Sequence, residues 1–322
     1  MDRSAATRRV ALVSLLLLAF VGTVTGLNLT LYSATGFVSS YLHALSRHDA
    51  EGALAMPGVT MTDDASKVLL ASSALPELSD IRLVSDAAHA GGHHTVVFGY
   101  TVAGKSGKTS FTVQRNGSRF GVFSGWRFSR SPVTTLTITP LHGQQFRANS
   151  IDITTKASAG TATDYLVFAP AAVALSYRSE YFVAPKAVTV VDSTTDPARA
   201  TVDIEANKAF VAEVQKELDA HLKECVTQQV LLPTGCPMGK QITDRIQNDP
   251  VWSMVGYPKI TITAGDTEGS WLVPETEGTA HLVVQVKSIF DGKLSTFDSD
   301  VPFTVSYEIT FPNNQLTITA KY

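Results

Sequence analysis

The chain has 322 residues and a mass of 34.5 kDa, which is enough for two or three domains that each bury a core. Charged residues make up only 17 % of it while apolar residues reach an ordinary 44 %, so small polar residues must cover much of the surface. The net charge of −3, from 26 basic and 29 acidic residues, argues against a nucleic-acid partner. This profile is typical of an extracytoplasmic protein and does not fit a transporter with several spans.

An uncharged, mostly apolar run near the N-terminus begins at Val10 and ends at Tyr32. As a helix it would measure about 34 Å, enough to cross a membrane hydrocarbon core. Arg8 and Arg9 precede the run and the next charged residue is Arg47, so the positive-inside rule places residues 1–9 in the cytoplasm. We therefore expect a single-pass transmembrane helix in the cell membrane, with the rest of the chain outside.

A cleaved secretory signal is the alternative interpretation of the same run. Val24 and Gly26 are small residues at suitable positions for cleavage before Leu27. The run exceeds the apolar core of a usual signal, about 7–15 residues, which favours the anchor. Under either interpretation the bulk of the chain is extracytoplasmic.

The first segment, residues 33–131, shows helical periodicity followed by alternation. Apolar spacing over 35–56, with Asp49 as a cap, predicts a helical hairpin, and an amphipathic stretch over 65–75 predicts a further helix. Strands are expected near 81–88, 95–102, 110–115 and 125–130, with turns at Gly91-Gly92, Lys105–Gly107 and Asn116-Gly117. Together these predict an α+β cone, in which helices cover a curled antiparallel sheet.

Alternation places one set of side chains on the inner face of this sheet. The set is almost wholly apolar: Val96, Phe98, Tyr100, Phe111, Val113, Trp126 and Phe128. A catalytic cone would need a carboxylate or a histidine there to move a proton, and only Tyr100 could titrate. We therefore expect a filled core and no catalytic residue.

Two stretches of the first segment resemble a known module. "FVSSYLHALSRHDAEGAL" and "GWRFS" look like the two ends of a nuclear-transport-factor-like, or cystatin-like, α+β module. Such modules are similar to those of membrane-anchored bacterial envelope proteins of the TcaA type, which bear on the response to wall-directed antibiotics. The resemblance implies an envelope protein, but members of the fold include both enzymes and binding domains.

The second segment, residues 132–204, is rich in Thr, Val and Ala and predicts a small all-β module. Strands are expected near 134–139, 150–155, 165–168, 172–176 and 187–191. Residues 140–143 and Pro185 are interpreted as turn and edge positions. The stretches "TLTITPLHGQQFRANSIDIT" and "YLVFAPAAVALSY" resemble small β domains of the same envelope proteins, with Ala169 or Ala171 in place of the usual Gly.

The third segment, residues 205–322, predicts a second α+β domain. A helix is expected over 205–228, with Phe210, Val214, Leu218 and Leu222 on one face, and a short helix over 241–248. Strands are expected near 259–264, 270–274, 280–287, 303–311 and 315–321, the last two joined at Asn313-Asn314, with Trp252 and Trp271 as core residues. The run "LKECVTQQVLLPTGCPMG" resembles one in exported actinobacterial proteins of unknown function.

The chain has two cysteines, Cys225 at the expected helix end and Cys236 after a short loop. In an oxidising compartment this pair predicts a disulfide, which would stabilise the third segment by about 3 kcal/mol in the chain-entropy model. Two free thiols are the alternative.

Two motifs could suggest a bound ligand. The stretch from Gly99 to Ser106 matches a phosphate-binding loop, but strands on both sides predict a hairpin turn instead. His89, His93 and His94 could hold a metal, but the glycines between them favour a solvated turn. No nucleophile or zinc-protease motif occurs, so we expect no catalytic, cofactor-binding or metal-binding residues.

These observations favour a non-catalytic interaction or sensing protein of the cell envelope, anchored in the membrane by its N-terminal helix. Its expected partners are cell-wall components or envelope proteins, contacted through exposed strands, loops or joints between domains. The alternative is a small-molecule-binding or catalytic pocket protein built on the first cone. The sequence carries no signal for a particular oligomeric state.

Overall fold

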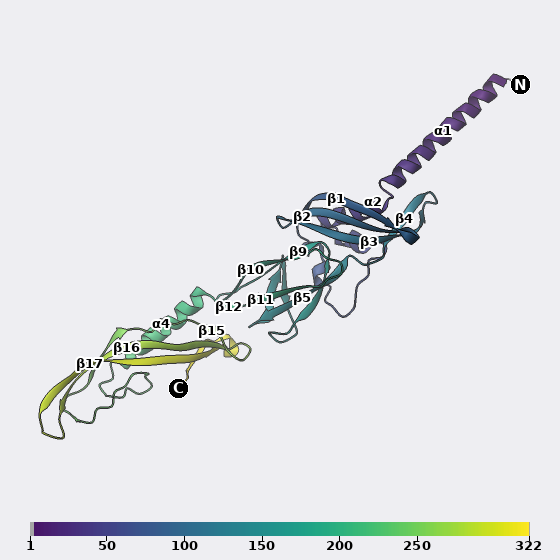
Figure 1. Cartoon of the computed structure of the whole chain (residues 1–322). Helices are drawn as coiled ribbons and strands as arrows, with labels where there is room; N and C mark the ends of the chain where they lie inside the picture. Colours follow the sequence, from purple (N-terminus) through teal and green to yellow (C-terminus); the bar gives the residue numbers. More distant parts are fainter. Residues whose placement is uncertain (1–2, 322) are drawn as a thin grey trace.

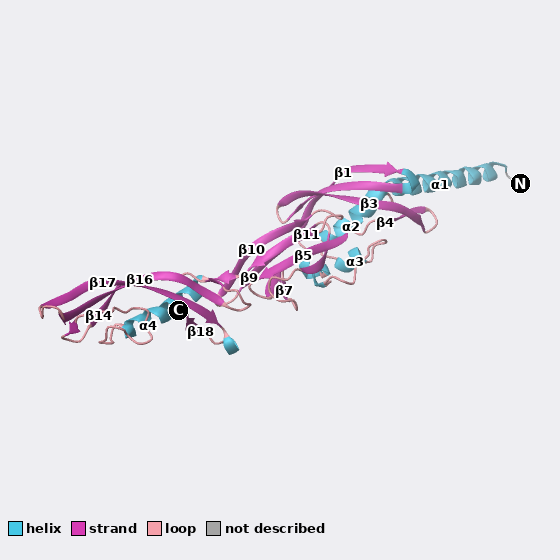
Figure 2. Ribbon diagram, turned by 60° about the horizontal axis from the view of Figure 1, so that its bottom comes forward, coloured by secondary structure: helices cyan, strands magenta, loops and turns pink. Residues whose placement is uncertain are grey.

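The computed structural model describes residues 3–321 and shows an elongated molecule of mixed helix and sheet, in which strands predominate (Figure 1). An apolar helix leaves one end, and three sheet-containing regions follow one another away from it in both ribbon views (Figures 1 and 2). These regions are formed by the first, second and third segments. The order in the chain is therefore also the order along the length of the molecule.

The N-terminal helix α1 runs from Arg3 to Leu29, and its apolar part, Ala11–Leu29, is long enough to cross a membrane. Arg8, Arg9 and Val10 belong to this helix, but their side chains are outside the described part. The predicted end at Tyr32 is wrong by three residues. The helix stops at Leu29 because the backbone N–H of Tyr32 turns back to the carbonyl of Leu27, 2.9 Å away.

The predicted helical hairpin is confirmed by α2 (Ala34–Ser46) and α3 (Ala50–Leu54). Ser33 and Asp49 cap them, since their side-chain oxygens accept the backbone N–H groups of Gly36 and Gly52 at 3.0 and 2.8 Å.

The helix predicted over 65–75 is wrong. Two single 3₁₀ turns, Val68–Leu70 and Ser72–Ala74, occupy its place. The backbone of Ser66 bonds to Asp164 and Leu166 in the second segment, and this pairing draws the chain into an extended form before a helix can begin.

Four antiparallel strands form the curled sheet of the first segment in chain order: β1 (Leu78–His89), β2 (His93–Val102), β3 (Lys105–Arg119) and β4 (Phe123–Phe128). Two turns differ from the prediction. The β2–β3 turn is Ala103-Gly104, because both residues adopt positive φ, whereas Lys105 already belongs to β3. Asn116-Gly117 lies inside β3 at a bulge, and the chain reverses at residues 120–122.

The second segment, with the first two residues of the third, forms two sheets, with strand orders β12-β10-β9-β6-β7 and β11-β5-β8. Their bounds are β5 (Val133–Leu141), β6 (Gln145–Ala148), β7 (Ile151–Thr154), β8 (Thr163–Phe168), β9 (Ala171–Arg178), β10 (Phe182–Val191), β11 (Ala198–Asp203) and β12 (Glu205–Ala206). The prediction omitted β6, β11 and β12. Pro140 lies within β5 rather than in a turn, and Pro185 lies at a bulge of β10.

The third segment packs α4 (Lys208–Cys225) against a six-stranded sheet. Its strands are β13 (Arg245–Ile246), β14 (Val251–Gly256), β15 (Thr263–Ala264), β16 (Trp271–Lys287), β17 (Leu294–Thr310) and β18 (Thr317–Ala320). The two strands predicted at 270–274 and 280–287 are one long strand, because Pro274 lies in a bulge that needs no N–H. The hairpin at Asn313-Asn314 is confirmed by the pairing of β17 with β18.

The short helix predicted over 241–248 is wrong. Its residues instead extend along β16, where the Asn248 side chain accepts the backbone N–H of Gln285 at 2.6 Å, and the Gln247 N–H bonds to the Gln285 carbonyl. Pairing with an existing strand satisfies these backbone groups at once, which an isolated helix of two turns cannot do as well.

Two hydrophobic clusters form the interior, and neither is confined to one predicted segment. The first combines the helices and sheet of the first segment with Leu166, Phe168 and Ala172 of the second. The other joins the second segment to the third and also contains Leu69 and Ala74 of the first. The segments therefore share buried surface at both joints, and their exact domain boundaries stay predictions.

Candidate functional site

The β16–β17 hairpin forms the end of the molecule that lies farthest from α1 (Figure 1). Each of its strands has 17 residues, and both ribbon views show the hairpin extending away from the other segments (Figure 2). The connection between the strands is the turn at residues 288–293. We call residues 287–294 the distal tip.

Hydrogen bonds hold the distal tip in one conformation. The Ser288 N–H donates to the Lys293 carbonyl at 2.9 Å, and the Gly292 N–H donates to the Ser288 carbonyl at 3.0 Å. The hydroxyl oxygen of Ser288 also accepts the N–H groups of Phe290 and Asp291, at 3.2 and 3.3 Å. Gly292 has a φ of +74°, which a side chain would disfavour. Hydrogen bonds within the turn therefore order its backbone.

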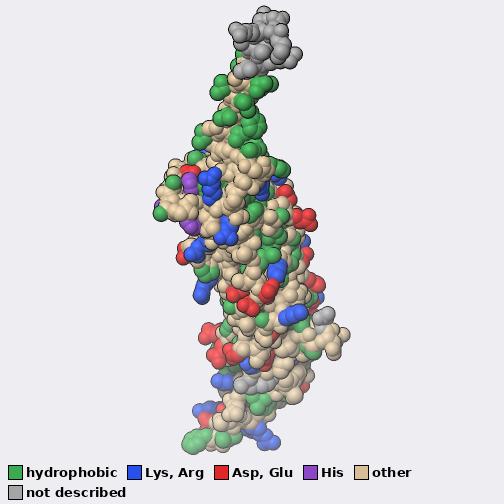
Figure 3. Space-filling view, turned by 90° about the vertical axis from the view of Figure 1, so that its right-hand side faces the viewer, with side chains coloured by type: hydrophobic (Ala, Val, Ile, Leu, Met, Phe, Trp, Pro, Cys, Tyr) green, Lys and Arg blue, Asp and Glu red, His purple; other side chains and the backbone are tan. Residues whose placement is uncertain are grey.

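Three large apolar side chains of the distal tip face solvent. Phe290 is 98 % exposed, Ile289 74 % and Leu294 70 %. Figure 3 shows hydrophobic side chains gathered at the end opposite the helix, with Lys and Arg side chains beside them. Isolated exposed apolar residues are ordinary, but a group of them on an ordered turn is typical of an interaction surface.

Charged residues surround this apolar group. Lys287 and Arg245 lie opposite each other in the β13–β16 ladder, and Lys293 pairs with Asp291 at 3.1 Å. The backbone N–H of Lys293 lowers the pKa of Asp291 below its ordinary value, with further help from Ser288 and the Lys293 side chain. An apolar centre with a charged rim is the usual composition of a protein contact site.

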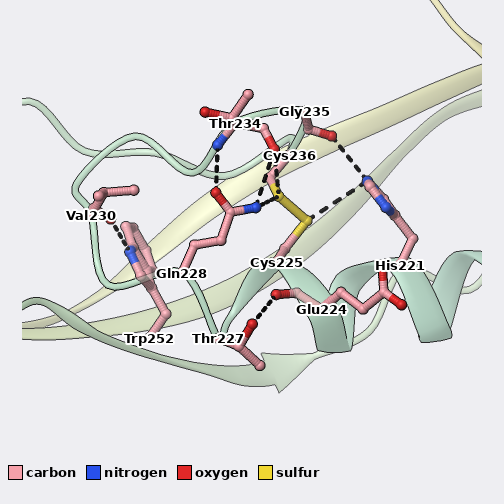
Figure 4. Close-up of a disulfide and its surroundings, with 10 residues drawn as sticks. All are labelled: His221, Glu224, Cys225, Thr227, Gln228, Val230, Thr234, Gly235, Cys236 and Trp252. Atoms are coloured by element: carbon pink, nitrogen blue, oxygen red, sulfur yellow. Dashed lines mark hydrogen bonds between the residues drawn. A yellow bond between two sulfur atoms is a disulfide. The ribbon is translucent and has the colours of Figure 1, made fainter.

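The structure brings together the two predicted disulfide residues. Cys225 at the end of α4 is bonded to Cys236, with the Cα atoms 5.8 Å apart (Figure 4). Gln228 supports the loop from inside, because its amide oxygen accepts the Thr234 N–H at 2.8 Å. His221 lies one turn before Cys225 and donates from Nε2 to the Gly235 carbonyl at 2.9 Å. Sequence reasoning missed His221, although the i, i+4 spacing to Cys225 places the two on one helix face.

Within residues 3–321, His221, Cys225 and Cys236 are the only group of three or more potential metal ligands whose ligand atoms all lie within 4.8 Å of one another. Both sulfur atoms are bonded to each other, so they offer no thiolate to a metal.

The three histidines of the β1–β2 hairpin do not form a group of potential metal ligands in the part of the chain that the structure describes. Nδ1 of His94 faces the Asp86 carboxylate at 2.6 Å, and Nε2 of His89 lies 3.0 Å from the Thr95 hydroxyl. Partners from the hairpin itself therefore occupy these ring nitrogens. The interpretation of residues 99–106 as a hairpin is confirmed, since β2 passes directly into β3 at Ala103-Gly104.

The inner face of the first sheet is packed as predicted, except that Trp126 is only partly buried. Tyr41 and Tyr100 are fully buried. The Tyr41 hydroxyl donates to the Ala169 carbonyl at 3.1 Å, and burial raises its pKa well above the ordinary value. Burial likewise raises the pKa of Tyr100 to about 12. Both hydroxyls thus serve structural hydrogen bonds.

An open groove of about 1030 Å³ lies at the joint between the second and third segments. It is lined by aromatic and polar residues, among them His142, Tyr181, Phe182 and Trp271. Nδ1 of His142 lies 3.1 Å from a carboxylate oxygen of Asp203. Several of its lining residues, Tyr181, Phe182, Trp271 and Phe311, belong to the aromatic packing that connects the two segments.

Comparison of the chain with protein-family models, curated proteins and solved structures found no match. Any assignment of function must therefore come from the geometry of this chain.

Proposed function

We propose that this protein is a membrane-anchored, extracytoplasmic and non-catalytic interaction protein of the cell envelope, which presents its distal tip to a protein partner. The apolar part of α1 is long enough to cross a membrane, and a signal sequence can have the same length and apolar composition. The three segments extend from it in line, and buried surface connects them at both joints. In this proposal the chain is a stalk and the distal tip is its contact site.

The observation that carries this proposal is the exposure of Phe290. A phenylalanine that is 98 % exposed adds no packing to the fold, yet it sits on a fully hydrogen-bonded turn at the end opposite α1. An aromatic anchor on a preorganised turn loses little conformational entropy on binding, and such residues often dominate protein interfaces. Lys293 is paired with Asp291, so among the described residues the unpaired positive charge of the rim comes from Lys287 and Arg245, which favours a partner with acidic groups around an apolar pocket.

The domain layout belongs to the same proposal. Helices α2 and α3 cover the inner face of a curled four-stranded sheet, which supports a cystatin-like module for residues 33–131. The strands between Val133 and Asp203 support a small all-β module for residues 132–204, and α4 with its sheet supports a second α+β domain for residues 205–322. This layout agrees with the resemblance to envelope proteins of the TcaA type.

The filled interior of the first cone favours this proposal over a pocket protein. Six of the seven predicted inner side chains are buried, and the hydroxyls of Tyr41 and Tyr100 are engaged by other groups of the chain. A substrate would have to displace that packing.

Photo-crosslinking in intact native cells tests the proposal. Phe290 is replaced by a photoreactive phenylalanine, and the control carries the same group at Val255, which is 61 % exposed in the same segment. We expect a discrete protein adduct from position 290 that is absent from position 255. Equal adducts at both positions, or none at 290, would contradict the proposal, and an adduct with wall glycan would replace the protein partner by the cell wall.

The anchor is tested separately by the N-terminus of the mature protein. Retention of residues 10–26 in the membrane fraction supports the stalk. A mature chain that begins at Leu27 would show that the run is a cleaved signal.

A further inference from the structure

We propose that the β3–β4 hairpin is a second membrane contact, in which Phe120 and Val122 enter the interface of the outer leaflet and Arg115 and Arg119 bind lipid phosphates. The inference rests on the proposed function only in that α1 must remain as the anchor. The hairpin tip is the turn at residues 120–122. In both ribbon views it reaches toward the side from which α1 leaves the first segment (Figures 1 and 2).

Hydrogen bonds connect the hairpin directly to the end of the apolar helix. The side-chain amide of Asn28 donates to the Val122 carbonyl at 3.0 Å, and its oxygen accepts the Ser124 N–H at 2.7 Å. Just beyond the helix, Tyr32 stacks on Phe123 with ring centroids 4.2 Å apart. These contacts fix the hairpin tip at the level where the apolar span, Ala11–Leu29, ends.

Chain geometry then limits how far Phe120 can lie from the membrane surface. Only Gly121 separates it from Val122, and the two Cα-to-Cα steps between them span at most about 7 Å. The polar interface of a bilayer is about 5–8 Å thick on each side. Because Val122 is bonded to Asn28, one residue before the end of the span, Phe120 lies within reach of this interface. Aromatic residues are enriched there in membrane proteins.

The conformation of Phe120 is an independent sign of a role outside the fold. Its side chain is 86 % exposed, and its φ is +51°, a left-handed value that is costly for an aromatic residue. Asn or Gly would suit this turn better if stability were the only requirement. An exposed phenylalanine in a strained position contributes little to the fold, so its placement fits contact with an external apolar phase.

The charge of the hairpin suits a phosphate surface. The part of the hairpin from Phe111 to Phe128 contains three Arg and no Asp or Glu. Among these, Arg115 and Arg119 are exposed and lie within five residues of Phe120. One N–H of Arg115 donates to the Ser124 hydroxyl at 3.1 Å, which holds its guanidinium against the hairpin and leaves other N–H groups to donate. Arginine binds phosphate through paired N–H groups, so these two side chains can hold lipid headgroups while the apolar tip enters the interface.

Quenching of a fluorescent label by spin-labelled lipid tests this contact in the full chain. The protein has no free cysteine, so single substitutions Val122→Cys, Leu294→Cys and Leu18→Cys each accept one environment-sensitive fluorophore. The proteins are reconstituted in vesicles of phosphatidylcholine and phosphatidylglycerol that contain a lipid with a nitroxide high on its acyl chain. Leu18 lies in the apolar span and reports the anchor, whereas Leu294 lies at the distal tip and is the matched exposed control.

We expect several-fold stronger quenching and bluer emission at position 122 than at 294. Adding Phe120→Ser should reduce quenching at 122 by at least half, while Phe290→Ser should not change it at 294. Replacing Arg115 and Arg119 by Gln should weaken quenching at 122 only when phosphatidylglycerol is present. Quenching at 18 together with equal values at 122 and 294 would overturn the hairpin contact and leave the anchor standing. No quenching at 18 would overturn both.

Discussion

Phe182 and Trp271 stack across the joint between the second and third segments, with ring centroids 4.7 Å apart and ring planes within 20° of parallel. Phe210 of α4 meets both rings edge-on, at 5.4 and 6.1 Å. Strand β10, helix α4 and strand β16 therefore share one aromatic cluster. Since β16 continues to the distal tip, this cluster fixes the direction in which the tip points.

Trp271→Ala should loosen this joint as well as destabilise the protein. Removing a buried tryptophan leaves a cavity, so we expect the free energy of unfolding to fall by about 3–5 kcal/mol. Spin labels at Val122→Cys and Leu294→Cys should also show a broader distance distribution. Trp252→Ala is the matched control, because Trp252 is equally buried but donates its Nε1–H to Val230, within the third segment. Equal broadening in both variants would contradict the role of the joint.

Replacing Cys225 and Cys236 by Ser should destabilise the third segment alone. The disulfide closes a local loop, with a sequence separation of 11, so its loss should cost about 3 kcal/mol in the chain-entropy model. Hydrogen exchange resolved along the chain should accelerate in α4 and the loop to Cys236, with unchanged protection in β1–β4. Faster exchange throughout the first segment would show that the effect is not local. The native protein should contain no thiol that can be alkylated.

His281 should titrate above its ordinary pKa. The main cause is its hydrogen bond from Nδ1 to Asp300 of β17, at 2.7 Å. Asp298, also on β17, faces Nε2 at 2.9 Å. Because folding raises this pKa, the pair adds stability that is fully present below about pH 6.5 and is lost as the pH rises through the folded-state pKa. Asp300→Asn should lower the pKa of His281 measured by NMR titration. Asp291→Asn is the control and should leave it unchanged.

Thr109→Val should destabilise the first segment because it leaves the buried Tyr100 hydroxyl without a hydrogen-bond acceptor. Thr109 donates to the Asp192 carbonyl at 2.6 Å, so the Tyr100 hydroxyl, 2.7 Å away, must donate to Thr109. Valine keeps the shape but removes the acceptor, which should cost about 1–3 kcal/mol in chemical unfolding. Thr109→Ser retains the hydroxyl and should cost clearly less. Equal losses for the two variants would show that the methyl group, not the hydrogen bond, matters here.

Local sequence signals predicted α1 to α4 and many of the strands, although they also predicted two helices, over 65–75 and 241–248, that do not form. Asp49 caps α3 as predicted, and Phe210, Val214 and Leu222 place one face of α4 in the core. These features depend on neighbours within a few residues, which hydrophobic periodicity and capping describe well. The disulfide was also predictable, since only two cysteines occur and they are close in the chain.

The candidate sites were harder to predict, because periodicity does not distinguish an exposed apolar residue from a buried one. Asp291-Gly292 is a strong turn signal, and it would have placed Phe290 at a hairpin tip. It could not show that this hairpin ends the molecule. Nothing local to Phe120 indicates that Asn28, more than ninety residues earlier, fixes the hairpin beside the membrane helix.

The sequence alone thus determined the apolar helix, the capped helices, the alternating strands and the cysteine pair, because each depends on residues close in the chain. Only the tertiary structure decided the strand that replaces the 241–248 helix, the extended pairing of Ser66, the stacking of Phe182 on Trp271 and the position of both hairpin tips. Each of these depends on a backbone or ring partner supplied by a distant segment. Such partners are selected by the packing of the whole chain, and no local pattern encodes them.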